Sequence, residues 1–459
     1  AQANLAQGGE GQQPPGWHGP ALWMNSFLPS WTSDLPSMNM ADDSVVYGPP
    51  AWTLDHDALE VIWTVFRPGY LVAIFVLGWA MNVAVFGQFK VDYCTVLGIA
   101  KDEVVSPGRL IVVALSLLMA FGACRFALLD APSVLAILWS MLAAYAIGLF
   151  GLFIHLPSAL DQRFRWRIPI ARALWRSVCP DTSREIPFVE VLVADGLTSL
   201  SKVFFDLAVC TCVASSSLLD NSPEPLSSQL LHGFEIYSGV ALNSTAAIAG
   251  ARPVVGVKHT FWGEHLTECR RSAFPYFAWS IPFLLRARQC TIAARHAPDS
   301  LARDLQRVNF LKYLTALPVI AFAFCYVRAG EFSQMLKKED FEFMWALAAV
   351  LNSMFSFLWD LVMDWGLLQP GADTFGLRQV LLFKGVFGFY QVLILQNLIG
   401  RTLWSLRWSP QATLTLGAFL LGTFQQSAEV FRRCLWNLLR VEWECIKKGV
   451  HRVEKHFPV

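Results

Sequence analysis

The chain has 459 residues, of which 54% are hydrophobic and 15% are charged, and its formal net charge is +1. Soluble globular proteins carry about 25% charged residues, so this composition excludes an ordinary soluble protein. The near-neutral charge argues against a nucleic-acid partner, and we expect none. The 18 tryptophans suit the aromatic belts at membrane interfaces, since many lie near the ends of apolar runs. The sequence therefore predicts an all-α, polytopic bundle of helices whose surroundings are a lipid bilayer.

The first part of the chain, residues 1–57, is rich in Gln, Gly, Pro, Ser and Asn. Such a composition predicts a disordered tail. No signal-peptide pattern is visible there, and the chain opens on Ala1, so a preceding segment could have been removed.

Apolar runs of spanning length, about 20 residues, then follow one another. We expect them near 61–87, 108–129, 133–155, 188–217, 272–292, 310–329, 343–367, 379–404 and 409–436. The short basic stretch 163–176 is either an amphipathic helix at the interface or a further span. The prediction is thus a bundle of about nine or ten transmembrane helices.

Basic residues in short loops mark the cytosolic side of a membrane protein. They place 161–176, 286–307 and 432–455 in the cytosol, and hence 218–270 on the opposite side. That loop contains Asn243-Ser-Thr, a glycosylation acceptor that is used only outside the cytosol. It is flanked by Cys212 and Cys269, which could form a disulfide there, although the sequence alone does not establish the pairing.

Motifs for catalysis or for a bound metal are missing from the sequence. The 10 cysteines show no CxxC or CxxH spacing, and there is no P-loop, GxSxG or HExxH pattern. We therefore expect no metal, no cofactor and no enzymatic activity. A membrane enzyme that used Asp360 and Asp364 is the weakest hypothesis, because no nucleophile or metal-ligand set accompanies these carboxylates.

Several apolar runs nevertheless contain ionisable residues, which in membrane helices tend to face a polar interior. In 188–217, Asp195, Thr198 or Ser199, Lys202 and Asp206 share one helical face, although Lys202 and Asp206 could simply neutralise each other.

In later runs, polar residues again recur at a spacing of one helical turn. Lys312 and Tyr313 open the run 310–329, and Lys312 could either bind a ligand or extend to the interface. Asp360 and Asp364 repel each other one turn apart, so at least one needs a cationic partner. Asn397, Arg401 and Trp404 occupy successive turns.

The last run carries the most distinctive group of charges. Glu429 lies one turn before both Arg432 and Arg433 and can pair with either. Two guanidinium groups and one carboxylate have a net positive charge. The planar guanidinium can donate two parallel hydrogen bonds, which suits a phosphate or carboxylate oxyanion. Alternatively, the helix ends here at the cytosolic interface and the arginines extend into it. The charges of all the runs nearly balance, so they could bind an anion or form a static structural network.

Three of these segments resemble the EXS-domain family: Trp359-Asp-Leu-Val-Met-Asp-Trp-Gly-Leu367, Glu429-Val-Phe-Arg-Arg-Cys-Leu-Trp-Asn437 and Ala194-Asp-Gly-Leu-Thr-Ser-Leu200. The family includes the xenotropic and polytropic retrovirus receptor, plant phosphate exporters and the yeast ER-retention-defective protein of the Golgi. The resemblance covers about 58–445. It divides the chain into N-terminal membrane helices at 58–180, a transport core at 181–445 and a cytosolic tail at 446–459.

The resemblance implies export of inorganic phosphate from the cytosol through a path in the last six helices. Residues that match the family's phosphate path are Asp195, Thr198, Ser201, Lys312, Tyr313, Asp364, Arg401, Arg432 and Arg433. Trp404 matches a gate residue and Glu429 the acidic partner of the arginines, and we place Asn397 and Asp360 beside them. Cys212 and Cys269 match an extracytosolic disulfide.

The chain departs from the animal exporter at several points. Thr198 stands in place of Asn, Lys202 in place of an apolar residue, and the nearest counterpart of one path arginine is Arg303. No SPX domain is expected, so a soluble regulator could supply regulation. The chain is thus closer to the Golgi protein, which favours Golgi or other endomembranes over the plasma membrane. The alternative function is a sorting factor that binds glycosyltransferase tails, and a homodimer is conceivable in either case.

Overall fold

The computed structural model describes residues 56–129, 134–154, 162–219, 261–332, 337–368, 376–383 and 388–450. Within these ranges the chain forms helices and no strand, so the predicted all-α membrane fold is confirmed. Residues 1–55, the acceptor Asn243 and residues 451–459 lie outside the described ranges.

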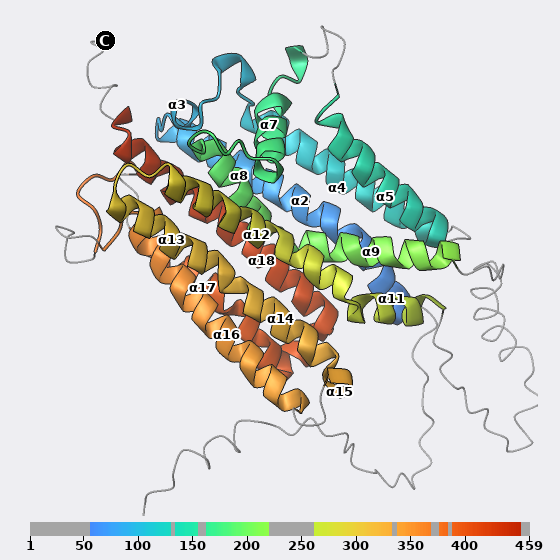
Figure 1. The fold of residues 1–459 in the computed structure, drawn as a ribbon. Helices are drawn as coiled ribbons and strands as arrows, with labels where there is room; N and C mark the ends of the chain where they lie inside the picture. Colours follow the sequence, from blue (N-terminus) through green and yellow to red (C-terminus); the bar gives the residue numbers. More distant parts are fainter. Residues whose placement is uncertain are drawn as a thin grey trace, which may run out of the picture. The chain divides into compact units, whose positions relative to one another are not determined.

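Figure 1 shows how the helices are arranged. The first group contains α2 (His56–Gln88), α3 (Tyr93–Leu97), α4 (Pro107–Leu129), α5 (Val134–Gly151), α7 (Arg167–Val178), α8 (Phe188–Ser199) and α9 (Ser201–Leu219). The second group contains α11 (Phe261–Arg271), α12 (Ala273–Arg295), α13 (Ser300–Leu314), α14 (Ala316–Val327), α15 (Ala329–Phe332), α16 (Lys338–Trp359), α17 (Phe389–Thr402) and α18 (Pro410–Lys447). Two 3-10 helices, η1 (Lys101–Glu103) and η4 (Leu403–Trp408), and a π-helical turn, η3 (Asp360–Asp364), complete the described fold.

Among the described residues, three helical stretches are long and apolar enough to cross a membrane: Trp63–Gln88, Ser300–Val327 and Lys338–Asp364. The pair α8 and α9 passes the same test only together, with a bend of 59° between them. Charged and amide side chains lower the hydropathy of α12 and α18. The described helices thus provide up to four clear spans, fewer than the predicted nine or ten.

The basic stretch 163–176 forms α7, a helix of 12 residues. Such a helix is about 18 Å long, too short for the hydrocarbon core of about 30 Å. The structure therefore favours the interfacial helix over the additional span.

The C-terminal helix α18 lies at the centre of the contacts that build the site. It packs against α2 on one side and α17 on the other (Figure 1). Close approach depends on small residues: a Cβ atom added at Gly78 of α2 would lie 2.1 Å from Cys434 Sγ of α18. Opposite this pair, α12 packs against α8, α9, α13 and α14.

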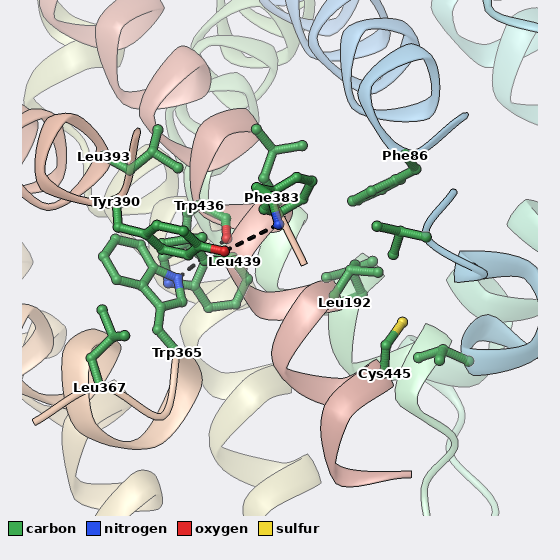
Figure 2. Close-up of a cluster of buried hydrophobic side chains, with 14 of the residues drawn as sticks. Phe86, Leu192, Trp365, Leu367, Phe383, Tyr390, Leu393, Trp436, Leu439 and Cys445 are labelled. Atoms are coloured by element: carbon green, nitrogen blue, oxygen red, sulfur yellow. Dashed lines mark hydrogen bonds between the residues drawn. The ribbon is translucent and has the colours of Figure 1, made fainter. Parts of the chain in front are cut away.

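A buried aromatic cluster joins α2, α8, α17 and α18 (Figure 2). Trp365 Nε1 donates to the backbone oxygen of Trp436 at 3.3 Å, and the amide of Phe383 donates to the Tyr390 hydroxyl at 3.3 Å. The Tyr390 hydroxyl in turn donates to Glu442 at 2.6 Å. These bonds connect the segments of the cluster and hold α18 in register against α17.

Three predicted runs differ from single regular α-helices in the structure. The run 188–217 is broken at Leu200, whose amide donates to Gly196 O and Leu197 O and ends α8. The run 343–367 ends in a π-helical turn, Asp360–Asp364. The run 379–404 becomes helical only at Phe389, after Gly388 with φ of 71°. The run 188–217 is therefore a bent pair of helices and the helix of the run 379–404 begins at Phe389, whereas the run 343–367 still forms one helical stretch, Lys338–Asp364.

Candidate functional site

A cavity of about 440 Å³ lies among the helices of the C-terminal half. Its wall contains charged side chains from α9, α13, α17 and α18 and from the π-helical turn. The positive ones are Lys202, Lys312, Arg401, Arg432 and Arg433, and the negative ones are Asp360 and Glu429. Hydroxyl and amide groups from α8, α9, α16 and α18 complete the polar lining: Thr198, Ser199, Ser201, Asn352, Ser353, Ser356, Gln425 and Gln426.

Arg432 is fixed by a double hydrogen bond to Glu429. Its Nε and Nη2 atoms donate to the two carboxylate oxygens at 2.8 and 2.6 Å, and Nη1 donates to Asn397 at 2.7 Å. Arg432 is 1% exposed, whereas the side chain of Glu429 is 36% exposed because it faces the cavity. This bidentate geometry orients the guanidinium and satisfies its charge. The alternative of a helix end with arginines at the interface is wrong, because α18 continues to Lys447.

Asp360 holds a second arginine. Arg401 donates to Asp360 Oδ2 from Nε at 3.0 Å and from Nη2 at 2.5 Å, and Asn397 donates to the same oxygen at 3.0 Å. Arg432 lies 3.9 Å from this oxygen. Asp360 and Asn397 therefore join the two arginines into one buried network.

Asp364 has cationic partners of its own. Lys312 Nζ lies 3.4 Å from Asp364 Oδ2, and Arg440 Nε lies 3.6 Å from Oδ1. The prediction that at least one of Asp360 and Asp364 requires a cation is confirmed, since both are paired. Asp364 does not line the cavity and acts on it only through Lys312.

Arg433 differs from its neighbour in its partners. It donates to the hydroxyls of Ser199 at 2.9 Å and Thr198 at 3.4 Å, and its guanidinium lies 4.4 Å from the Trp436 ring centroid. It is 7% exposed, and no carboxylate of the described chain lies within 4.0 Å of it. Ser199 in turn donates to Glu429 at 2.9 Å. Arg433 is thus a buried cation on the cavity wall whose partners are neutral.

Asp195 lies behind the wall in a separate group. Arg286 Nε and the Tyr313 hydroxyl donate to Asp195 Oδ1 at 2.7 and 2.6 Å, and Arg286 also donates to Gln289 at 2.6 Å. Tyr313 lines the cavity, whereas Asp195 does not. Asp195 therefore positions Tyr313 and α12.

Trp404 closes one side of the cavity near α16. Its Nε1 atom donates to Ser353 Oγ at 3.1 Å, and its ring packs edge-on against Trp345 and Trp408. The role of Trp404 as a gate stays a prediction, although its place on the wall is compatible with it.

The predicted cysteine pair is present, since Cys212 and Cys269 form a disulfide. It joins α9 to α11 at the end of the loop that contains Asn243. The use of Asn243 as a glycosylation acceptor stays a prediction, because this residue lies outside the described ranges.

Comparison with known proteins identifies the family of this chain. The EXS family matches residues 62–446 of the chain. The chain belongs to the EXS family. This domain thus contains the whole cavity and every helix that lines it.

Three relatives with different names illustrate what this chain is similar to. It is 26% identical over 391 residues to "Solute carrier family 53 member 1" of Homo sapiens, which covers 83% of this chain and 50% of that protein. It is 28% identical over 319 residues to "Protein ERD1 homolog 1" of Schizosaccharomyces pombe, covering 67% and 70%. It is also 26% identical over 264 residues to "Xenotropic and polytropic retrovirus receptor 1 homolog" of Xenopus laevis, covering 57% and 32%. The chain spans about half the length of the solute carriers that it matches.

The structure gathers most of the predicted site residues of the EXS chain into one place. Thr198, Ser201, Lys312, Tyr313, Arg401, Arg432, Arg433, Trp404, Glu429 and Asp360 line the cavity. Asn397, Asp195 and Asp364 lie behind it as hydrogen-bond or ion-pair partners.

Two arginines differ from their sequence interpretation. Arg303, the nearest sequence counterpart of a family arginine, is exposed on α13 and does not line the cavity. Arg286 instead is buried beside Asp195, although its sequence context indicated only a basic cytosolic stretch. Its position within the apolar run 272–292, one turn before Gln289, was the signal that could have revealed it.

The described residues offer no group of three His, Cys, Asp or Glu side chains placed to hold a metal ion. The chemistry of the cavity is that of guanidinium, ammonium and hydroxyl donors, which suits an oxyanion.

Proposed function

We propose that this protein is a membrane transporter that carries inorganic phosphate out of the cytosol, down its gradient, through the cavity beside Arg433. The observation that carries the proposal is the buried Arg433 guanidinium, whose hydrogen-bond partners are the neutral hydroxyls of Thr198 and Ser199. A buried charge without a counterion is costly, and an oxyanion in the cavity would supply one.

The cavity has the wrong balance of charge for a closed structural network. Five cations and two carboxylates line it, and Lys312 gains a third carboxylate, Asp364, from behind the wall. Arg401 and Arg432 are paired with carboxylates, which fix the orientation of their guanidinium groups on the cavity wall. Arg433 can exchange its hydroxyl partners for a phosphate oxygen, because replacing neutral acceptors by a charged one strengthens the hydrogen bonds.

The named solute carriers among the relatives support a transport function, and phosphate is the substrate implied by the sequence resemblance. The match to the fission yeast protein covers 70% of that protein's length. This relative supports an endomembrane location, and we propose the Golgi. Passage is then from the cytosol into the lumen.

The test is efflux of radiolabelled phosphate from proteoliposomes that contain the purified full chain. Arg433→Ala removes a charge-assisted hydrogen-bond donor, so we expect phosphate flux at low substrate concentration to fall by about 10- to 100-fold. Arg303→Ala is the matched control, because Arg303 is an exposed arginine outside the cavity, and its flux should equal that of the unmodified protein.

Unlabelled phosphate and sulfate added as competitors distinguish a selective path from a general anion leak. Equal flux in Arg433→Ala and the unmodified protein, at equal amounts of folded protein, would show that the cavity is not the path.

A second function, a Golgi sorting factor for glycosyltransferases, is favoured by the dense pairing of Arg401 and Arg432 with Asp360 and Glu429. Such a network could be purely structural. In that case the purified protein binds glycosyltransferase cytosolic tails, and its proteoliposomes release no phosphate.

A further inference from the structure

Lys202 is a second cationic residue on the cavity wall, and it takes no part in the ion pairs of Arg401 and Arg432. Lys202 is the second residue of α9, directly after the 59° bend that separates α9 from α8. Its side chain lines the same cavity as Arg433. A helix that begins at such a break also directs its partly positive N-terminus toward the polar centre of the bundle.

The nearest carboxylate in the sequence does not neutralise Lys202. Asp206 lies one turn further along α9, but it accepts two hydrogen bonds from Arg67 of α2, at 2.7 and 2.5 Å. Asp206 is completely buried in this pair. In the described part of the chain, no carboxylate lies within 4.0 Å of Lys202 Nζ. The alternative in which Lys202 and Asp206 simply neutralise each other is therefore not what the structure shows, because Asp206 pairs with Arg67.

Aromatic rings hold the ammonium group in place. Lys202 Nζ lies 3.1 Å from the ring centroid of Trp279 and 4.7 Å from that of Phe205. Trp279 is itself fixed, because its Nε1 donates to Ser201 Oγ at 3.2 Å. A cation over an aromatic face is attracted by the ring, and an ammonium has three N–H donors. Ser201 accepts from Trp279 and retains its own O–H for a ligand.

We infer that Lys202, together with Ser201, is a second anion ligand of this cavity, and that it makes the site prefer doubly charged oxyanions to singly charged ones. This inference deepens the proposed phosphate transport and rests on it for the identity of the substrate. Arg433 and Lys202 each present a cationic group without a carboxylate partner to the same cavity. Two such charges are matched by a divalent oxyanion such as hydrogen phosphate, whereas a monovalent anion leaves one of them unneutralised.

The first experiment measures anion binding directly, independently of transport. The thermal unfolding midpoint of the purified full chain is recorded in sulfate and in nitrate at equal ionic strength, since a ligand that binds only the folded state raises this midpoint. For the unmodified protein and for Lys202→Arg, we expect sulfate to raise the unfolding midpoint more than nitrate does. For Lys202→Met, we expect this difference between the two anions to be lost. Lys338→Met is the matched control, because Lys338 also lies on an aromatic ring, 4.8 Å from the Tyr326 centroid, but outside the cavity.

The second experiment measures phosphate efflux from proteoliposomes. Lys202→Met should raise the phosphate concentration for half-maximal flux by about tenfold and weaken competition by sulfate, with Lys202→Arg close to the unmodified protein. A purely structural lysine would instead lower the amount of folded protein without changing the sulfate preference.

The outcomes separate the inference from the proposed function. If Lys202→Met folds and retains both the sulfate preference and the half-maximal concentration, Lys202 is not a ligand, and the proposed transport stands. A different outcome is that the unmodified protein carries no phosphate but is stabilised more by sulfate than by nitrate, and that Lys202→Met removes this difference. In that case the transport proposal fails and the assignment of Lys202 as an anion ligand stands. If sulfate and nitrate act equally on the unmodified protein, the inference is overturned.

Discussion

At the scale of single residues, the partners of each buried cation decide what that cation can do. Arg432 and Arg401 are held by Glu429 and Asp360, so their geometry is set before a ligand arrives. Arg433 contacts neutral hydroxyls, and Lys202 contacts aromatic rings. We expect the first pair to shape the cavity and the second pair to bind.

The ion pair of Asp360 and Arg401 gives a stability prediction. Asp360 is 1% exposed, and breaking a buried pair from one side costs about 3–5 kcal/mol. We expect Asp360→Asn to lower the free energy of unfolding in mixed micelles by that amount. The double variant Asp360→Asn with Arg401→Met should recover part of the loss, because it leaves fewer unpaired charges.

The double-mutant cycle decides between pairing and simple loss of packing. Strictly additive effects of Asp360→Asn and Arg401→Met would contradict an energetic coupling between these two side chains.

At the scale of helices, the sequence located the apolar runs well and their interruptions poorly. Hydropathy predicted the runs that became α2, α4, α12, α16 and α18, because a long apolar stretch has few alternatives in a bilayer. The break at Leu200 and the π-helical turn at Asp360–Asp364 were missed. Residues beside both breaks have partners on other helices, Arg286 for Asp195 and Arg401 for Asp360, which no local pattern encodes.

The close contact of α17 with α18 gives a prediction about Gly400. A Cβ atom at this position would lie 2.7 Å from Arg432 Cδ, and Arg432 cannot move away because Glu429 and Asn397 hold its guanidinium. We expect Gly400→Ala to destabilise the protein by about 1–3 kcal/mol and to lower phosphate flux by displacing Arg432.

Gly422 provides the control for this prediction. It lines the same cavity, but an added Cβ atom would meet no heavy atom within 4 Å. Gly422→Ala should therefore leave stability unchanged. Equal effects of the two substitutions would show that the contact with Arg432 is not the cause.

The disulfide between Cys212 and Cys269 connects α9 to α11 across 57 residues. Closing a loop of that length restricts the unfolded chain by about 4 kcal/mol. We expect Cys212→Ser to lower the thermal unfolding midpoint, and a reducing agent to lower that of the unmodified protein equally. Cys179→Ser, at an exposed free cysteine, should have no effect. An unchanged midpoint in Cys212→Ser would contradict a stabilising role for the bridge.

At the scale of the whole molecule, the disulfide and the basic segments agree on sidedness. Disulfides persist in oxidising compartments, so the bridge favours the lumen or the cell exterior for the α9–α11 end. Basic residues of α7 and of the α12–α13 connection mark the cytosolic side. This is the orientation expected from the sequence, and it stays a prediction, as does export as the direction of the proposed path.

The candidate site was predictable in its residues but not in their roles. The charged residues Glu429, Arg432 and Arg433 could be named from one helix. The sequence could not show that Arg432 is held by a carboxylate and that Arg433 has neutral partners, since Glu429 could pair with either arginine. The neutral partners Thr198 and Ser199 come from α8, far away in the sequence, and only the fold brings them to Arg433.

The most direct test of the central claim is a structure of the full chain determined in a high concentration of phosphate. We predict density for a tetrahedral oxyanion in the cavity, within hydrogen-bond distance of the Arg433 guanidinium. An empty cavity at saturating phosphate, with Arg433 still bound to Ser199 and Thr198, would contradict the account.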